Sequence, residues 1–280
     1  MSIPRRKLLL GALAVAPAII GCEIKSGSWG ARPAKDGRSK ITGRIVARAT
    51  TDGDGATLSR LFPAKQLANL DPFVLLDDFD VREPAGFPQH PHRGFEAFTY
   101  MIDGEFHHAD DLGNESSIST GGTQRFTSGR GARHSEMPGA GPSNRGLQLW
   151  VNLEASRKQM APEYEGIAGA DMPVREQDGL RVRTIVGPDS PVRLHTELDY
   201  LDVELLAARG WEREVTVGHN ALVYVLDGEL ELLGEQVARG SAVLLAPGAV
   251  TLRGGAGARF AWLTGRPHGQ PIRHRGPFVD

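Results

Sequence analysis

An internal repeat constrains the fold of this chain more than any other feature of its sequence. The segment AFTYMIDGE at residues 97–105 matches ALVYVLDGE at residues 221–229, at a constant offset of 124 residues. Each copy is a β-branched and aromatic run followed by an Asp-Gly pair, which is typical of a hairpin whose glycine takes a positive φ angle. Gly122 and Gly240 then follow at corresponding places. The repeat therefore predicts two related β-barrels in tandem.

Composition supports an all-β chain and excludes several functions. The 280 residues include 35 glycines and 18 prolines, which is typical of many short strands joined by tight turns. The formal net charge is −2, and it becomes about −5 without residues 1–21, which contain three basic and no acidic side chains. This charge argues against nucleic-acid binding. The sequence also lacks the motifs of a serine hydrolase elbow and of a phosphate loop.

Residues 1–21 are typical of an export signal. Arg5 and Arg6 precede the apolar run LLLGALAVAPAIIG, which is too short to span a bilayer comfortably. Adjacent arginines ahead of leucines are typical of the twin-arginine route, which carries folded proteins. The run ends in IIGC, which resembles the lipobox where bacterial lipoproteins are cut and acylated on cysteine. We therefore expect an exported protein that is lipid-anchored through Cys22.

The lipid anchor would hold the protein on the periplasmic side of a bacterial membrane, with residues 22–43 as a polar tether. Two other readings of this segment remain open. One is an ordinary secretory signal cut after Ala16, and the other is a buried N-terminal helix with a chance cysteine. Cys22 is the single cysteine of the chain, so no intramolecular disulfide can form.

The two repeats differ in their polar residues. We expect a first barrel over residues 44–165 and a second over residues 166–280. Aligning the copies at the repeat offset, with one gap in the later part, pairs each candidate metal ligand of the first copy with another residue type: His90 with Glu214, His92 with Thr216, His134 with Thr251, and Glu136 with Arg253. The first barrel is therefore predicted to hold a metal, and the second to be structural or to shape the pocket.

Two pairs of residues with i, i+2 spacing make up the predicted metal site. In His90-Pro91-His92 and His134-Ser135-Glu136, the two outer side chains project from the same face of an extended strand. Neighbouring strands would then present three imidazoles and one carboxylate to one point. Such a set suits Fe, Mn, Ni, Cu or Zn, and an octahedral ion would keep two positions open for exchangeable ligands.

Residues close to these pairs could complete a pocket. Arg93 could attract anionic ligands or hold a carboxylate behind the metal ligands, and an exposed salt bridge is its alternative. Gln148 and Trp150 alternate with apolar residues, so one face of this strand could reach the pocket. For Trp150 we favour a place in the hydrophobic core.

The remaining histidines receive no role from the sequence. His107 and His108 are adjacent and would point to opposite faces of a strand, so we interpret them as part of a solvated hairpin. The isolated histidines are His195, His219, His268 and His274.

Three motifs resemble the signature of the pirin family, whose members are double cupins, that is, two tandem jelly-roll barrels with one metal centre in the N-terminal barrel. These motifs are FPQHPHRGFEAFTYMIDGE, TSGRGARHSEMP and RGLQLWVNL, and the likeness extends from about Arg44 to the end of the chain. Carried over by position, the metal ligands of pirins fall on His90, His92, His134 and Glu136. The resemblance implies an all-β double cupin with one bound metal ion. Iron is the expected metal, and Mn, Ni, Cu or Zn are the alternatives.

The resemblance also implies an activity. Bacterial pirins resemble quercetin 2,3-dioxygenases, so we expect a metal-dependent dioxygenase that uses dioxygen on a flavonol-like or other enolic phenol. In this reading Glu136 accepts a proton from the substrate. The alternatives are a non-catalytic metal- or redox-responsive binding protein, and an envelope lipoprotein with a structural metal.

Overall fold

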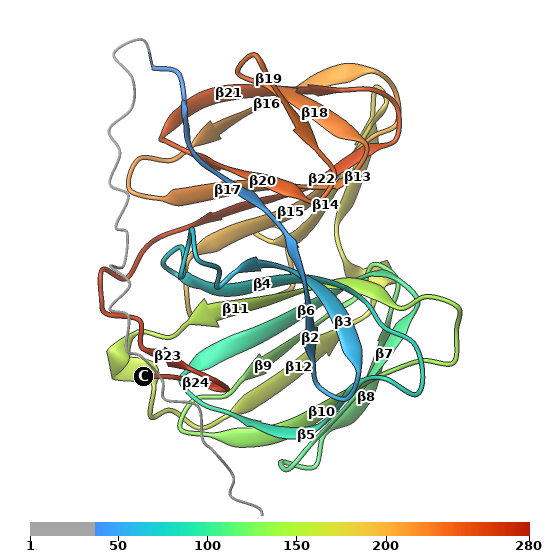
Figure 1. Cartoon of the computed structure of the whole chain (residues 1–280), viewed down its shortest axis with the longest axis vertical. Coiled ribbons are helices and arrows are strands. Elements are labelled where there is room, and N and C mark those ends of the chain that lie inside the picture. Colours follow the sequence, from blue (N-terminus) through green and yellow to red (C-terminus); the bar gives the residue numbers. More distant parts are fainter. Residues whose placement is uncertain (1–36) are drawn as a thin grey trace, which may run out of the picture.

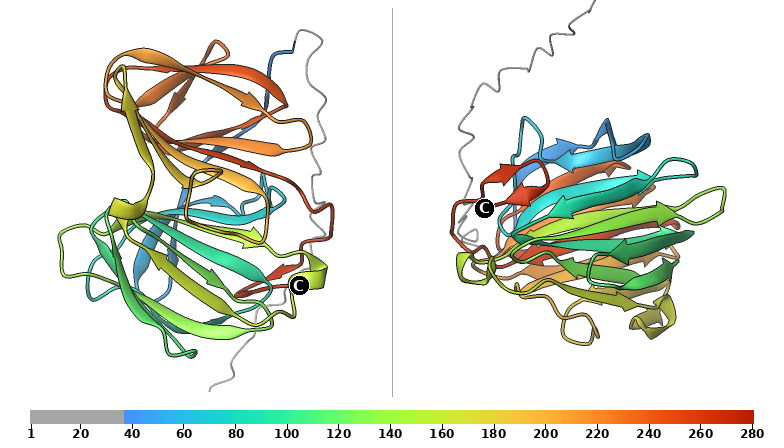
Figure 2. Two further views of the ribbon diagram at one scale, coloured as in Figure 1. Left: turned by 180° about the vertical axis from the view of Figure 1, so that it is seen from behind. Right: turned by 90° about the horizontal axis from the view of Figure 1, so that it is seen from below.

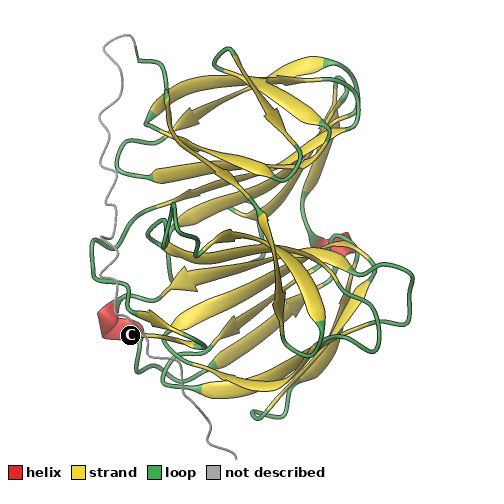
Figure 3. Cartoon of the chain, in the orientation of Figure 1, coloured by secondary structure: helices red, strands yellow, loops and turns green. Residues whose placement is uncertain are grey.

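Residues 37–280, the part of the chain that the computed structural model describes, fold almost entirely into β-strands (Figure 3). Within this part, the helices are two single 3-10 turns, η1 (Ala155–Arg157) and η2 (Gly169–Asp171). The strands form two barrels stacked along the long axis of the molecule, as Figures 1 and 2 show. Gly104 and Gly228, the turn glycines of the repeat, have φ angles of 78° and 70°. The predicted all-β fold of two tandem barrels is therefore confirmed.

The first barrel consists of a seven-stranded and a four-stranded antiparallel sheet. The larger sheet has the order β12-β9-β6-β11-β4-β3-β2 and the smaller one β5-β10-β7-β8. Their strands are β2 (Arg48–Asp52), β3 (Ala56–Phe62), β4 (Phe73–Asp80), β5 (Phe87–His92), β6 (Phe95–Asp103), β7 (Glu105–Asp110), β8 (Glu115–Ser119), β9 (Thr123–Thr127), β10 (Ala132–Pro138), β11 (Arg145–Asn152) and β12 (Glu163–Ile167).

The second barrel repeats this architecture. Its larger sheet has the order β1-β20-β17-β22-β15-β14-β13 and its smaller sheet β16-β21-β18-β19. Their strands are β1 (Ile41–Val46), β13 (Val174–Gln177), β14 (Leu180–Val186), β15 (Leu198–Leu205), β16 (Arg209–Val215), β17 (Asn220–Asp227), β18 (Glu229–Leu232), β19 (Glu235–Ala238), β20 (Ser241–Leu245), β21 (Gly248–Gly254) and β22 (Ala258–Gly265).

Each end of the described chain packs on the barrel that is more distant in sequence. Strand β1 comes first in sequence, yet it pairs with β20 of the second barrel before the chain enters β2 of the first. At the other end, β23 (His274–Arg275) and β24 (Phe278–Val279) follow the second barrel but lie beside the first, as Figure 1 shows. The barrel limits of residues 44–165 and 166–280 remain a prediction about domain extent, and β1 lies across the first of them.

The apolar side chains differ between the two barrel interiors. In the second barrel one continuous cluster, which includes Trp211, Val223, Leu252 and Trp262, fills the interior. In the first barrel the apolar residues form two separate clusters, one around Phe79 and Phe106 and the other around Phe95 and Phe126. Buried polar residues of the inner face lie outside both clusters: Thr99, Gln124, His134 and Glu136.

The barrels pack through a shared core between their larger sheets. Two polar contacts flank this core and are related by the repeat. The Tyr100 hydroxyl of the first barrel donates to Asp202 of the second at 2.6 Å, and the Tyr224 hydroxyl of the second donates to Asp78 of the first at 2.8 Å. Tyrosine and aspartate are each 124 residues from their counterparts. The internal duplication is thus visible in the contact between the barrels.

The sequence-based expectations for the signal, the tether and Cys22 concern residues outside the described range, apart from the last part of the tether. Among residues 37–280, no helix has the length and apolar character needed to cross a membrane.

Candidate metal centre

Strands β5 and β10 of the smaller sheet carry the predicted metal ligands. The two strands pair antiparallel, with His90 opposite His134 and Pro91 opposite Arg133. The register shifts between His134 and Glu136. A shift of this kind re-aims the side chains that follow it, and such irregularities are common at barrel sites.

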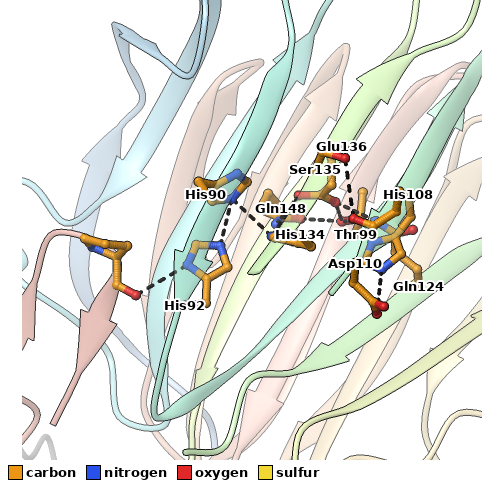
Figure 4. A network of polar contacts seen from close by, with 12 residues as sticks. His90, His92, Thr99, His108, Asp110, Gln124, His134, Ser135, Glu136 and Gln148 are labelled. Carbon is orange, nitrogen blue, oxygen red and sulfur yellow. Dashed lines mark hydrogen bonds and ion pairs between the residues drawn. The ribbon is translucent and has the colours of Figure 1, made fainter. Parts of the chain in front are cut away.

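The imidazoles of His90, His92 and His134 meet at one point, as Figure 4 shows. The Nε2 atom of His90 lies 3.0 Å from Nε2 of His92 and 3.1 Å from Nε2 of His134. The ligand atoms of all three residues lie within 4.8 Å of one another. Three nitrogens that face one another at this spacing are arranged to donate lone pairs to a single cation.

Backbone carbonyl groups fix which ring nitrogen carries the proton in two of these histidines. Nδ1 of His90 lies 2.8 Å from the Pro88 carbonyl oxygen, and Nδ1 of His92 lies 3.3 Å from that of Pro277. A carbonyl oxygen can only accept a hydrogen bond, so each Nδ1 must donate. Their Nε2 atoms are then unprotonated and free to bind a metal.

Burial keeps His92 and His134 neutral, which is the form of imidazole that binds metals. Desolvation, with electrostatic repulsion between the His90 and His92 rings as the second cause, lowers the pKa of His92 from 6.5 to about 3. Desolvation also lowers the pKa of His134 well below 6.5, with repulsion from the other histidines as the second cause. The buried Nδ1 of His134 has no hydrogen-bond partner. The donor atoms present therefore fit a divalent transition-metal ion.

The carboxylate of Glu136 lies next to the three imidazoles. Its Oε2 is 3.9 Å from Nε2 of His134, but the group whose ligand atoms all lie close to one another contains the three histidines and not Glu136. Thr99 Oγ1 and Gln124 Nε2 donate to Oε1 at 2.7 and 2.5 Å, and Gln148 Nε2 donates to Oε2 at 3.3 Å. These three donors hold the carboxylate on the inner face of the barrel.

A cavity of about 390 Å³ opens beside the histidines. Most of its wall is apolar or aromatic: Leu58, Leu75, Phe79, Phe87, Phe106 and Trp150. Polar groups line it at a few places, namely His90, His92, Glu136, Gln148, His274 and a cluster in which Arg60 binds Asp52 and Asp77. A concave apolar site with a small number of convergent polar groups is typical of small-molecule binding.

Of the other residues that we considered for the pocket, Gln148 and Trp150 line the cavity and Arg93 does not. Gln148 lines the cavity and contacts Glu136. Trp150, which we favoured as a core residue, also lines the cavity. Its ring stacks on that of Phe95, with the ring centroids 4.1 Å apart, and lies edge to face with His92, with the centroids 4.9 Å apart. Arg93 does not line the cavity and forms a two-pronged ion pair with Asp280.

The interpretation of His108 as part of a solvated hairpin is wrong, although it holds for its neighbour. His107 is exposed, whereas the His108 side chain is completely buried, stacked on Tyr164 at 3.9 Å and 3.2 Å from Asp110. Strand β7 pairs with β10 and has the same alternation, so one of two adjacent histidines must face the interior. That alternation was the signal that could have identified His108.

The residues that the sequence alignment paired with the metal ligands are not the inward-facing residues of β16 and β21. The alignment in these two strands is shifted by one residue. The buried side chains on β16 and β21 include Trp211, Val215, Val250 and Leu252, whereas Glu214 and Arg253 are exposed. Among residues 37–280, one cluster of side chains could hold a metal ion, and it lies in the first barrel. The interior of the second barrel is filled by apolar side chains, where the first barrel has the polar residues of its inner face.

Comparisons with known proteins agree with this architecture. The family model of pirin matches residues 55–151, and that of the pirin C-terminal cupin domain matches residues 200–280. A pirin-like protein of Solanum lycopersicum is 38% identical, over 85% of this chain and 86% of its own length. The crystal structure of quercetin 2,3-dioxygenase from Acinetobacter baumannii has a TM-score of 0.80 at 30% identity, covering 86% of this chain and 92% of that one.

A more distant solved structure supports the fold. The bacterial pirin YhhW of Escherichia coli, in complex with nickel(II), has a TM-score of 0.67 at 18% identity, covering 80% of this chain and 99% of that one. The expected double cupin is therefore confirmed, and the chain belongs to the pirin family.

Proposed function

We propose that this protein is a metal-dependent dioxygenase of the quercetin 2,3-dioxygenase type, acting on flavonol-like or other enolic phenols with dioxygen as the second substrate. The observation that carries the proposal is the convergence of three imidazoles, two of which, His90 and His92, line an aromatic-walled cavity. The similarity to the Acinetobacter baumannii quercetin 2,3-dioxygenase supports the reaction class. Iron is the metal we favour, and Mn, Ni, Cu and Zn suit the same ligands.

His90, His92 and His134 would hold the metal, with Glu136 as a fourth ligand after a small side-chain movement. When bound, the metal supplies Lewis-acid stabilisation of negative charge on a substrate oxygen. The aromatic faces of Trp150 and Phe106 would orient a planar ring in the cavity.

Glu136 would also accept the proton of the enol or phenol. It lies at the cavity wall, and the hydrogen bonds from Thr99, Gln124 and Gln148 fix the direction of its carboxylate. A proton acceptor that is already positioned needs little rearrangement when the substrate binds. The Arg60 cluster offers further hydrogen-bond partners for the hydroxyl groups of a polyphenol.

The test is turnover by metallated protein. Protein covering residues 23–280 is loaded separately with Fe(II), Mn(II) and Ni(II), and loss of the visible absorbance of quercetin is followed together with dioxygen uptake. His92→Ala should lose metal and turnover together, whereas His107→Ala, which removes an exposed histidine of the same barrel, should keep both. Fully metallated protein that leaves quercetin and related phenols unchanged would refute the dioxygenase proposal in favour of a binding role.

We also propose export and lipid anchoring through Cys22, on the periplasmic side of a bacterial membrane. The proposal rests on the paired arginines and the IIGC motif. Fractionation of cells that express the full chain should place it with membranes, and mass spectrometry should find an acylated N-terminal cysteine. Cys22→Ala should release the protein from the membrane, and its retention there would contradict the proposal.

A further inference from the structure

The last seven residues of the chain, 274–280, lie on the barrel that they do not follow in sequence. The chain leaves the second barrel after β22 and reaches the first next to β5, where Phe278 forms an isolated bridge with Arg93, the residue after β5. Val279 is fully buried among apolar residues of the first barrel, in the cluster around Phe95. His274, Gly276 and Pro277 form part of the wall of the metal-site cavity. We call residues 274–280 the C-terminal strap.

We propose that the C-terminal strap is a positioning element of the metal centre, which fixes the orientation and the tautomer of His92. This inference rests on the metal-binding part of the proposed function and does not depend on dioxygenase turnover. The proposal also assigns a role to the second barrel, because the strap that contacts the metal centre follows that barrel in sequence.

The contact that carries the proposal runs from the strap backbone to a metal ligand. The Pro277 carbonyl oxygen accepts the hydrogen of His92 Nδ1 at 3.3 Å. This contact requires the Nδ1-protonated tautomer, whose Nε2 lone pair faces Nε2 of His90 at 3.0 Å. A free imidazole exchanges between two tautomers and two ring orientations, and only one combination suits the metal. Second partners of this kind are known to tune metal affinity.

Two cations that are not metal ligands clamp the strap in place. Arg93, the residue after His92, donates to both carboxylate oxygens of Asp280 at 2.9 and 3.0 Å, and its guanidinium lies 4.6 Å from the centre of the Phe278 ring. Lys158 Nζ donates to the carbonyl oxygens of Gly94 and Val279, each at 2.8 Å. Both clamps therefore join the strap to Arg93 and Gly94, the two residues that directly follow the metal ligand.

Gly94 shows how closely the strap approaches this backbone. Its φ angle is +85°, and a Cβ atom at this position would lie 1.9 Å from the Val279 carbonyl oxygen. A side chain at residue 94 could not coexist with the docked strap. The sequence HPHRG therefore supplies two metal ligands, one strap clamp and the space that the strap backbone occupies.

The experiment releases the strap in the full chain and measures the ligand. The variant combines Asp280→Arg, which sets two guanidinium groups against each other, with Lys158→Met. Three quantities are compared with the unmodified protein: hydrogen exchange of residues 274–280, the nitrogen chemical shifts of His92 in metal-free protein, and Co(II) affinity by chelator competition. The control is Arg175→Gln, which removes an exposed ion pair with Asp189 in the second barrel.

We expect the double variant to release the strap, to show a mixture of His92 tautomers, and to bind Co(II) about 10- to 100-fold more weakly, as for other partners behind metal ligands. The control should match the unmodified protein in all three measurements. A released strap with an unchanged tautomer and Co(II) affinity would overturn the proposal. Protection of residues 274–280 that persists without both clamps would also overturn it. Failure of the unmodified protein to bind Co(II) or any other ion would refute the proposed function instead. The two failures can be distinguished, because the His92 tautomer is measured in metal-free protein.

Discussion

Replacing Tyr224 with phenylalanine should destabilise the protein more than the same replacement at Tyr100, although the two residues are counterparts in the repeat. Each hydroxyl donates to an aspartate of the other barrel, Tyr224 to Asp78 at 2.8 Å and Tyr100 to Asp202 at 2.6 Å. Phenylalanine keeps the ring and its packing, so the change removes little more than the hydrogen bond.

The remaining partners of each aspartate set the magnitude. Arg259 donates to both oxygens of Asp202 at 2.8 and 2.6 Å, so this carboxylate stays well paired without Tyr100. Asp78 keeps only an Arg145 nitrogen at 3.6 Å, and burial raises its pKa. The loss at Tyr100 should therefore cost about 1 kcal/mol, the net value of an ordinary hydrogen bond, and the loss at Tyr224 about 2 to 3 kcal/mol, because a buried charge loses its best donor.

The assay is equilibrium unfolding in urea, followed by circular dichroism, for both single variants and the double variant. The two costs should add within about 0.5 kcal/mol, since the pairs share no partner. Equal costs, or a larger cost at Tyr100, would refute the reasoning that the second partner of each aspartate decides the outcome.

Three further predictions concern the barrel interior. In metal-free protein His92 has a pKa of about 3 when folded and 6.5 when unfolded, so the unfolded state binds more protons between these values. The His92 contribution to stability should therefore fall by about 1 kcal/mol per pH unit as the pH drops from 6.5 toward 3, with His134 acting in the same direction, and urea unfolding of His92→Gln should lose the His92 part. His108→Gln should lower the thermal midpoint yet leave one metal per chain, and loss of the metal would place His108 among the ligands. Gly146→Ala should cost about 1 to 3 kcal/mol, because its Cβ would lie 2.5 Å from the Phe79 ring. Gly141→Ala should leave the thermal midpoint unchanged, because its Cβ would meet only the Ser143 carbonyl oxygen, at an ordinary contact distance of 3.6 Å.

Local sequence patterns predicted the fold and the convergence of the three histidines because each depends on short-range geometry. The Asp-Gly turns marked equivalent hairpins, and the i, i+2 spacing placed His90 and His92 on one face of β5. Burial of His108 follows from the same strand period, but the alternation was used only to argue that His107 and His108 point apart, and not to assign one of them to the interior. The position of Glu136, beside the imidazoles and bound to three neutral donors, depends on a register shift that the sequence pattern does not encode.

The C-terminal strap could not be predicted from the sequence. Its contact with His92 joins residues 185 positions apart, and nothing in HRGPFVD indicates which barrel it will cover. The role of Arg93 was unclear for the same reason, since Asp280 lies 187 positions away. Contacts of this kind are set by the packing of whole sheets, which single-strand patterns do not contain.

The central claim is that His90, His92 and His134 form one transition-metal centre in the first barrel. Its most direct test is the metal content per chain, measured by mass spectrometry after loading with Fe(II) or Ni(II) and removal of free ion. The unmodified protein and His107→Ala should each retain one metal ion, and His134→Ala should retain none. An unchanged metal content in His134→Ala, or no metal in the unmodified protein, would contradict the account.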